Sequence, residues 1–393
     1  MGEGMTDNRG MRGNGPALAG VQFFFTLGWT VYALYLPELL NQAGIAASWL
    51  PVLLMADQLI FAAMDVAFGS VADRVADGYR RLAQLLLWLT TVSAGAFLAL
   101  PMLAGVSSGG LLVVLVVWVI TASVVRVPTL VLLAKQAKAA QPGHLVAWYA
   151  GGMALASALS PFAGVALKGI DPRLPFAVSA LALLAAVGVL LRVSGGQPPQ
   201  PQSDALQPIA FGAYLPLLLL LGIATFGFQV HAMVNAGPLY LALAAKESLP
   251  WLMPLLWVGF FAALLGVGGL VKRVGALPVA ASGILLTALA SHGAVAAHAL
   301  EGLNLAQVLV GAGWALAFVG LMERASADGT RGAEGVFMGS FFAVMAISSF
   351  ARIGFAKYFL PHLQGIQFEL PAALLLAAGL LAALYAGARR QSR

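Results

Sequence analysis

The stretch Gly69-Ser70-Val71-Ala72-Asp73-Arg74-Val75-Ala76-Asp77-Gly78-Tyr79-Arg80-Arg81 forms a polar turn between two long apolar segments. A second turn of related composition, Gly268-Gly269-Leu270-Val271-Lys272-Arg273-Val274-Gly275, follows another apolar segment in the second half of the chain. Each preceding segment also opens on a similar tetrapeptide, Ser48-Trp49-Leu50-Pro51 in the first case and Trp251-Leu252-Met253-Pro254 in the second. These matches indicate an internal repeat with one copy in each half.

The composition around these turns is that of a membrane protein. Of the 393 residues, 61% are hydrophobic and only 9% are charged, whereas soluble domains carry about 25% charged residues. This scarcity of charge excludes ordinary soluble enzymes and nucleic-acid-binding domains. The absence of cysteine also excludes disulfides and thiolate metal sites.

A helix needs about 20 mostly apolar residues to cross a bilayer. The sequence predicts twelve such helices, and therefore an all-α, polytopic membrane protein. The predicted spans are 18–40, 48–69, 82–103, 110–133, 145–166, 173–191, 212–241, 249–270, 276–297, 304–323, 335–357 and 370–388.

Basic residues predict the orientation of these helices. When the N-terminus is placed inside, most of the 21 Lys and Arg residues fall in cytoplasmic segments, as the positive-inside rule requires. We therefore expect a multi-pass protein of the plasma (inner) membrane with both termini in the cytoplasm. The net charge of +6 is then a signal of topology.

The longest internal polar stretch divides six spans from six, and its Gly, Pro and Gln content is typical of a flexible linker. Repeated halves around a central cavity are common in secondary transporters. The predicted organisation is a cytoplasmic tail (1–16), a six-helix bundle (17–191), a cytoplasmic linker (192–211), a second six-helix bundle (212–388) and a second tail (389–393).

The turn at 69–81 resembles the signature loop of the major facilitator superfamily, and the matching turn at 268–275 extends the resemblance over the chain. The resemblance implies two pseudo-symmetric bundles that rock around a central site. It also implies a gating role for the loop, with Asp73 facing the positive N-terminus of span 11. The alternative is a simple turn that sets topology. The expected gating residues are Gly69, Asp73, Arg74, Gly78, Arg80, Arg81, Lys272 and Arg273.

Ionisable residues inside spans are costly and are therefore candidates for functional roles. Asp57 and Asp65 share a broad face of span 2, and either can carry a coupling proton. Arg126 lies in span 4 at a depth comparable with that of Asp65. The pair is either a buried structural ion pair, or Arg126 belongs to the substrate or coupling site.

Arg352 has no acidic residue in its own span. Because guanidinium groups suit planar oxyanions, Arg126 and Arg352 together are expected to hold a carboxylate, phosphate or sulfonate. The main alternative is a structural pairing of Arg352 with Glu323 or another carboxylate.

Polar residues in spans 1 and 7 complete the expected substrate site. His231 can carry a proton, or it can be a hydrogen-bonding part of the cavity wall. Gly237-Pro238 predicts a broken helix, and broken helices in transporters line cavities. The remaining expected contacts are Gln229 and Asn235 in span 7 and Thr26, Trp29 and Tyr32 in span 1.

The sequence has no metal-ligand spacing and no ATP-binding loop, so we expect no metal, no cofactor and no enzymatic activity. It predicts a secondary transporter, functional as a monomer, that moves a small organic anion or zwitterion across the membrane by alternating access. We expect this transport to be coupled to protons. The alternative is an exporter of lipophilic cations in exchange for protons. A membrane receptor or membrane enzyme would need an extra domain or a catalytic cluster.

Overall fold

The computed structural model describes residues 3–74, 79–134, 142–194, 211–329, 333–363 and 365–391. Within these ranges the chain is helical and has no strand, which confirms the all-α prediction. Gly78 of the signature loop and residues 195–210 of the expected linker lie outside the described residues. The expected N-terminal tail is helical from Glu3 onward, as part of the first helix.

The first half of the chain contains seven α-helices and two short 3₁₀ turns in its described part. In order, they are α1 Glu3–Gln42, η1 Ala47–Trp49, α2 Leu50–Arg74, α3 Tyr79–Leu103, α4 Ser108–Ala122, η2 Ser123–Val125, α5 Val127–Ala134, α6 Pro142–Ala166 and α7 Arg173–Ser194.

The second half adds two π turns, η3 and η5, to its α-helices and 3₁₀ turns. Its elements are α8 Phe211–Val230, η3 His231–Asn235, α9 Ala236–Leu241, η4 Lys246–Ser248, α10 Leu249–Leu252, α11 Leu255–Val274, α12 Ala276–Val295, α13 Leu300–Gly329, α14 Glu334–Gly354, η5 Phe355–Phe359, η6 Leu360–His362, η7 Ile366–Phe368 and α15 Leu370–Gln391.

Twelve helical segments of the described chain are long and apolar enough to cross a membrane. Each begins and ends within a few residues of its predicted counterpart. Several spans combine more than one element, such as span 4 (α4, η2 and α5) and span 7 (α8, η3 and α9). The prediction of twelve spans is confirmed.

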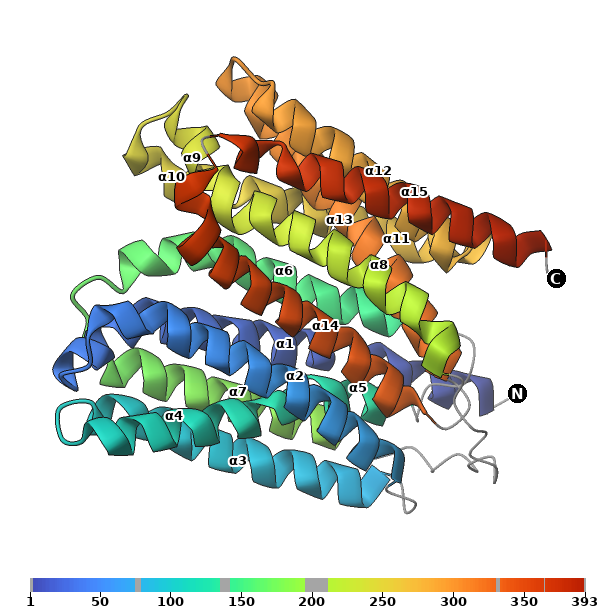
Figure 1. The fold of residues 1–393 in the computed structure, drawn as a ribbon. Helices are drawn as coiled ribbons and strands as arrows, with labels where there is room; N and C mark the ends of the chain where they lie inside the picture. The colour runs from blue at the N-terminus through green and yellow to red at the C-terminus, as the bar shows by residue number, and fades with distance from the viewer. Residues whose placement is uncertain are drawn as a thin grey trace.

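The helices form two bundles that lie side by side, with both chain termini at the same end (Figure 1). Helix α1 packs on α6 and α7 in the first bundle, and α8 packs on α14 and α15 in the second. The bundles meet through α2 against α14 and through α6 against α11. The space between these two contacts is where a central site belongs in a fold of two halves.

Proline interrupts span 4 at a point that determines the position of Arg126. Pro128 has no N–H to donate to the carbonyl of Val124, and its ring crowds that carbonyl. The helix therefore tightens into the 3₁₀ turn η2, and Arg126 follows at its end, with its backbone N–H bound to the carbonyl of Ser123 at 3.2 Å.

Span 7 deforms earlier than the sequence predicts. The expected break at Gly237-Pro238 is absent, since both residues lie within α9. The deformation is instead the π turn η3, in which the N–H of Ala236 bonds to the carbonyl of His231. Pro238 cannot bond to the carbonyl four residues before it, and widening the preceding turn accommodates this loss. Such π turns are frequent at functional sites.

Candidate functional site

The two bundles are held together at the termini end by the carboxylate of Asp73. Asp73 lies in the last turn of α2, and its two oxygens accept hydrogen bonds from the backbone N–H groups of Gly335 (2.7 Å) and Val336 (2.8 Å). These groups belong to the first turn of α14, where N–H donors have no partner within the helix and the dipole favours negative charge. The contact expected between Asp73 and span 11 is therefore present.

Glycines let α2 and α14 approach to backbone contact beside Asp73. A Cβ added at Gly69 would overlap the carbonyl oxygen of Gly335, and one added at Gly339 would overlap the carbonyl oxygen of Asp65. Gly335 and Gly339 are one turn apart on α14 and face α2. No side chain larger than hydrogen fits this contact, so the glycines close the termini end.

We expect Gly69→Val to open this contact, because its side chain would collide with the backbone of α14. The chain has no cysteine, so Ala343→Cys, a buried position on α14, provides a single reporter. Gly69→Val should increase the labelling rate of this cysteine by a membrane-impermeant maleimide. Gly266→Val, where an added Cβ meets nothing within 4 Å, is the matched control. Equal rates in both variants would contradict this role of the glycine contact.

Arg126 fills the space between the bundles just beyond this closure. Its Nη2 lies 3.3 Å from Oδ2 of Asp65, whose side chain is fully buried. Its guanidinium also stacks on Phe61 of α2 and Phe342 of α14, with centroid distances of 5.1 and 5.0 Å. The sequence-based pairing of Asp65 with Arg126 is therefore present in the structure, and the ring of Phe342 joins it from the other bundle.

The geometry of this ion pair leaves the carboxylate incompletely satisfied. Neither oxygen of Asp65 accepts a hydrogen bond within the described part of the chain, because the approach of Arg126 is close but poorly aligned. Nη2 of Arg126 instead reaches the carbonyl of Phe342 at 3.5 Å. Tyr149 of α6 packs against Phe342 with ring centroids 5.6 Å apart. Arg126, Phe342 and Tyr149 thus form a plug across the bundles.

Arg352 lies on the same side of α14 as this plug but further from the termini end. Ser349 follows Phe342 by seven residues, or two helical turns, and therefore shares its face. Arg352 lies one turn beyond Ser349. Both bind Gln229 of α8: Nε of Arg352 donates to Oε1 at 3.3 Å, and Nε2 of Gln229 donates to Ser349 at 3.0 Å. Arg352 therefore faces the space between the bundles.

No carboxylate forms an ion pair with Arg352 among the residues that the structure describes, so the alternative pairing with Glu323 is absent. The expectation that Arg126 and Arg352 together hold one oxyanion is also not met in this conformation. Arg126 contacts Phe342, and Arg352 lies ten residues further along α14, a rise of about 15 Å. The two arginines therefore occupy different levels of the molecule.

Asp57 and Tyr32 form a buried pair in the first bundle. The Tyr32 hydroxyl donates to Oδ2 of Asp57 at 2.7 Å, and the two side chains are 0% and 1% exposed. The other oxygen of Asp57 has no partner within the described chain. Trp29 and Tyr32 pack on Trp118 of α4, with ring centroids 5.4 and 4.6 Å apart. The structure thus joins three predicted residues, Trp29, Tyr32 and Asp57, into one cluster.

His231 is fully buried inside the second bundle. Its Nε2 lies 3.2 Å from Oε1 of Gln307 on α13, and its Nδ1 has no partner in the described chain. Asn235, one turn later, donates to the carbonyl of Gln367 at 2.7 Å. These contacts stay within one half of the molecule, so they favour the interpretation of His231 as a hydrogen-bonding wall residue.

The remaining expected residues are Thr26 and the basic residues of the two turns. Thr26 is half-buried on α1 and accepts a hydrogen bond from Gln22 at 3.4 Å. The basic residues expected to take part in gating have exposed side chains at helix ends; they are Arg74, Arg80, Arg81, Lys272 and Arg273. In the part of the chain that the structure describes, no group of His, Asp and Glu residues could hold a metal ion.

The sequence did not reveal the neutral partners of the site. Gln307, Ser349 and Trp118 each contact an expected residue, and Tyr149 contacts Phe342 beside Arg126, yet none of the four is ionisable near neutrality. Gln307 is an amide within a long apolar segment. A search of the sequence for polar residues inside spans could have found it, whereas a search for charged residues could not. The other three become apparent only from the packing of separate spans.

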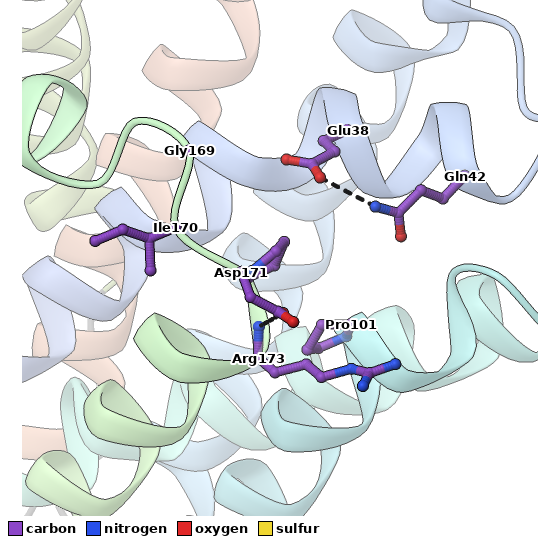
Figure 2. Close-up of a pocket in the computed structure, with 8 residues that line it drawn as sticks. Glu38, Gln42, Pro101, Gly169, Ile170, Asp171 and Arg173 are labelled. Carbon is purple, nitrogen blue, oxygen red and sulfur yellow. Dashed lines mark hydrogen bonds between the residues drawn. The ribbon is translucent and has the colours of Figure 1, made fainter.

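A hollow of about 470 Å³ opens at the end opposite the termini, and neither Arg126 nor Arg352 lines it. Figure 2 shows Glu38 bonded to Gln42 and the carboxylate of Asp171 bonded to the backbone of Arg173. The charged groups of this hollow are exposed and are already paired or solvated. It is a surface feature of the first bundle and does not lie between the halves.

Comparisons with known proteins agree with this architecture. The sequence profile described as Major Facilitator Superfamily matches residues 18–353. The fold is similar to the crystal structure of the human organic anion transporter MFSD10 (TETRAN), with a TM-score of 0.77 and 12% identity over 94% of this chain and 99% of that chain. No curated protein sequence matches the chain. The family match covers most of the chain and both halves, and the chain therefore belongs to the major facilitator superfamily, whose members are membrane transporters.

Proposed function

We propose that the protein is a secondary active transporter of small organic anions, which works by alternating access and couples transport to protons. Arg352 carries this proposal. It is a charged side chain between two membrane-spanning bundles, and no carboxylate of the described chain neutralises it. A buried charge needs a counter-charge, and an anionic solute that enters between the halves supplies one.

The contacts of Arg352 suit an oxyanion. Gln229 engages only Nε, so the Nη groups keep donors in the fork geometry that binds carboxylate, phosphate or sulfonate. Ser349 and Gln229 beside it provide neutral hydrogen-bonding groups. Phe226 and Phe355 lie one turn from Gln229 and Arg352 and pack together with ring centroids 5.9 Å apart. This apolar neighbour favours an anion with an organic portion.

The closure at the termini end supports alternating access. Asp73, the glycine contact and the plug at Phe342 join the bundles at one end. We place this end in the cytoplasm of a plasma (inner) membrane, with both chain termini, because the basic residues concentrate there. Because the cytoplasmic end is closed, the structure then corresponds to an outward-facing or occluded state of a monomeric transporter.

A thermal-shift screen of the purified protein tests the proposed substrate class. Bound solutes raise the apparent melting temperature through mass action. We expect shifts with aryl or alkyl carboxylates, sulfonates or phosphate monoesters, and none of these shifts with Arg352→Gln. Lipophilic amines form the contrasting panel. Shifts with amines alone, retained in Arg352→Gln, would reject the proposal.

The second candidate is an exporter of lipophilic cations. One observation favours it. Asp57 has an oxygen with no partner among the described residues, and it lies beside the aromatic cluster of Trp29, Tyr32 and Trp118; aromatic faces with a carboxylate attract cations. Asp57, Tyr32 and Trp118 are buried, so we rank this candidate below the anion transporter. In the same screen, amine-induced shifts that disappear with Asp57→Asn would support it.

A further inference from the structure

Asp57 and Arg352 are two charged groups within the spans that form no ion pair with any residue of the described chain. Asp57 belongs to the first bundle and is bound to the neutral hydroxyl of Tyr32. Arg352 belongs to the second bundle and is bound to the neutral amide of Gln229. Their charges are opposite, and each half contributes one of them. An ion pair between them requires that the fold place them close together.

The register of α2 against α14 places them within about one and a half helical turns of each other along the helix axes. The helices run antiparallel: Gly69 lies against Gly335, the backbone of Asp65 against Gly339, and the Met55 side chain 3.5 Å from the Cβ position of Gly354. Continuing the register of the two backbone contacts places Asp57 opposite Ile347, so Arg352 lies five residues, or about 7.5 Å, further from the termini end. Side chains on a helix lean toward its N-terminus, so in this antiparallel pair the side chains of Asp57 and Arg352 lean toward each other's level.

They also lie on the same side of the helix pair. Asp57, Phe61 and Asp65 are spaced by four residues, so they form one stripe on α2. Phe61 and Asp65 both contact Arg126, whose guanidinium also stacks on Phe342 of α14. Arg352 shares the side of α14 on which Phe342 and Ser349 lie. The two stripes thus flank one space, which Asp57 and Arg352 border from opposite bundles without being in contact.

No other charged group competes for Asp57 at this level. The elements packed on α2 are α1, α4, α5, α14, η1 and η2. Among their described side chains, the remaining charges lie at helix ends or are already bound. They are Glu38, bound to Gln42, Arg126, bound to Asp65, and Glu334 at the termini end of α14. Lys357 of η5, which follows α14, is bound to the carbonyl of Ser48 at the other end.

We propose that Asp57 and Arg352 form an ion pair across the bundles when the site is empty, and that protonation of Asp57 releases Arg352 to bind the organic anion. This inference rests on the proposed function of Arg352. In the empty state, the carboxylate of Asp57 neutralises the guanidinium. In the loaded state, one proton resides on Asp57 and one anionic group on Arg352. Proton and monovalent anion therefore enter and leave together as an electroneutral symport.

A double-mutant cycle without any transport substrate tests the pair. The variants are Asp57→Asn, Arg352→Gln and their combination, and thermal unfolding is measured at about pH 8 and about pH 5. At the higher pH we expect Arg352→Gln to be destabilising in the native background and nearly silent in Asp57→Asn, a non-additivity of about 3 °C. At the lower pH the non-additivity should disappear. Lys357→Gln, combined with Asp57→Asn, is the additive control.

The single variant Asp57→Asn gives a second test with a definite sign. If the pair forms, acidification removes it, so the native protein loses stability relative to Asp57→Asn. If Asp57 stays unpaired, acidification neutralises a buried charge, so the native protein gains stability relative to Asp57→Asn. That gain, or additivity of Asp57→Asn and Arg352→Gln at the higher pH, would overturn the inference.

These results separate the inference from the proposed function. Anion-induced thermal shifts that require Arg352, together with an additive cycle, would refute only the ion pair. A coupled cycle with no response to any organic anion would refute the proposed substrate class and leave the pair standing. Arg352→Lys, which keeps the charge, should retain part of the coupling.

Discussion

Replacing Arg352 with glutamine is expected to lower the affinity for the transported organic anion by at least about thirtyfold. Glutamine removes the positive charge and the donor fork, while the anion must still leave water to enter the space between the bundles. Gln229 and Ser349 remain, but neutral hydrogen bonds do not replace a guanidinium in a desolvated site. Uptake of a radiolabelled anion, selected in the thermal-shift screen, into liposomes measures the effect.

The matched control is Lys357→Gln, on the same segment of span 11. Lys357 is a cation about one and a half turns beyond Arg352, and it is half-buried and bound to the backbone of Ser48. Its replacement removes the same charge from the same span without touching Gln229. We expect nearly unchanged uptake. Equal losses in both variants would assign the effect to the general field of the protein and not to Arg352.

Replacing Arg126 with alanine is expected to lower the free energy of unfolding by about 3–5 kcal/mol. Removing the guanidinium leaves the carboxylate of Asp65 fully buried with no counter-charge. It also removes the stacking on Phe61 and Phe342 that joins the two bundles. Thermal or denaturant unfolding in detergent measures the loss.

A compensating substitution distinguishes the two interpretations of this pair. Arg126→Gln combined with Asp65→Asn removes both charges, so it should recover most of the stability that Arg126→Gln alone loses. If the double variant also transports the anion, Arg126 is a structural brace. A variant of Arg126 that unfolds like the native protein but no longer transports would instead place Arg126 in the substrate or coupling site.

Much of the fold follows from the sequence because bilayer thickness determines the length of each apolar segment. The twelve spans could be located to within a few residues, and equal depth was enough to pair Asp65 with Arg126. The contact of Asp73 with span 11 could also be predicted, because the N–H groups at a helix N-terminus bind a carboxylate. Family resemblance indicated which helix supplies it.

The rest of the site depends on how separate spans pack. The register of α2 against α14 is set by backbone contacts at Gly69, Gly335 and Gly339, and no local pattern encodes it. This register separates Arg126 from Arg352 and places Arg352 within about one and a half helical turns of Asp57. The neutral partners Gln229 and Tyr32 could be predicted only as polar residues, because their bonding partners lie on other helices.

The most direct test of proton-coupled anion transport uses purified protein in liposomes, with a pH gradient imposed and the membrane potential clamped at zero. The account predicts that an acidic exterior accelerates uptake of the organic anion by the native protein. It predicts that Asp57→Asn binds the anion but does not respond to the gradient, and that Arg352→Gln does not transport it. Uptake that ignores the gradient in the native protein, or that survives Arg352→Gln, would contradict the account.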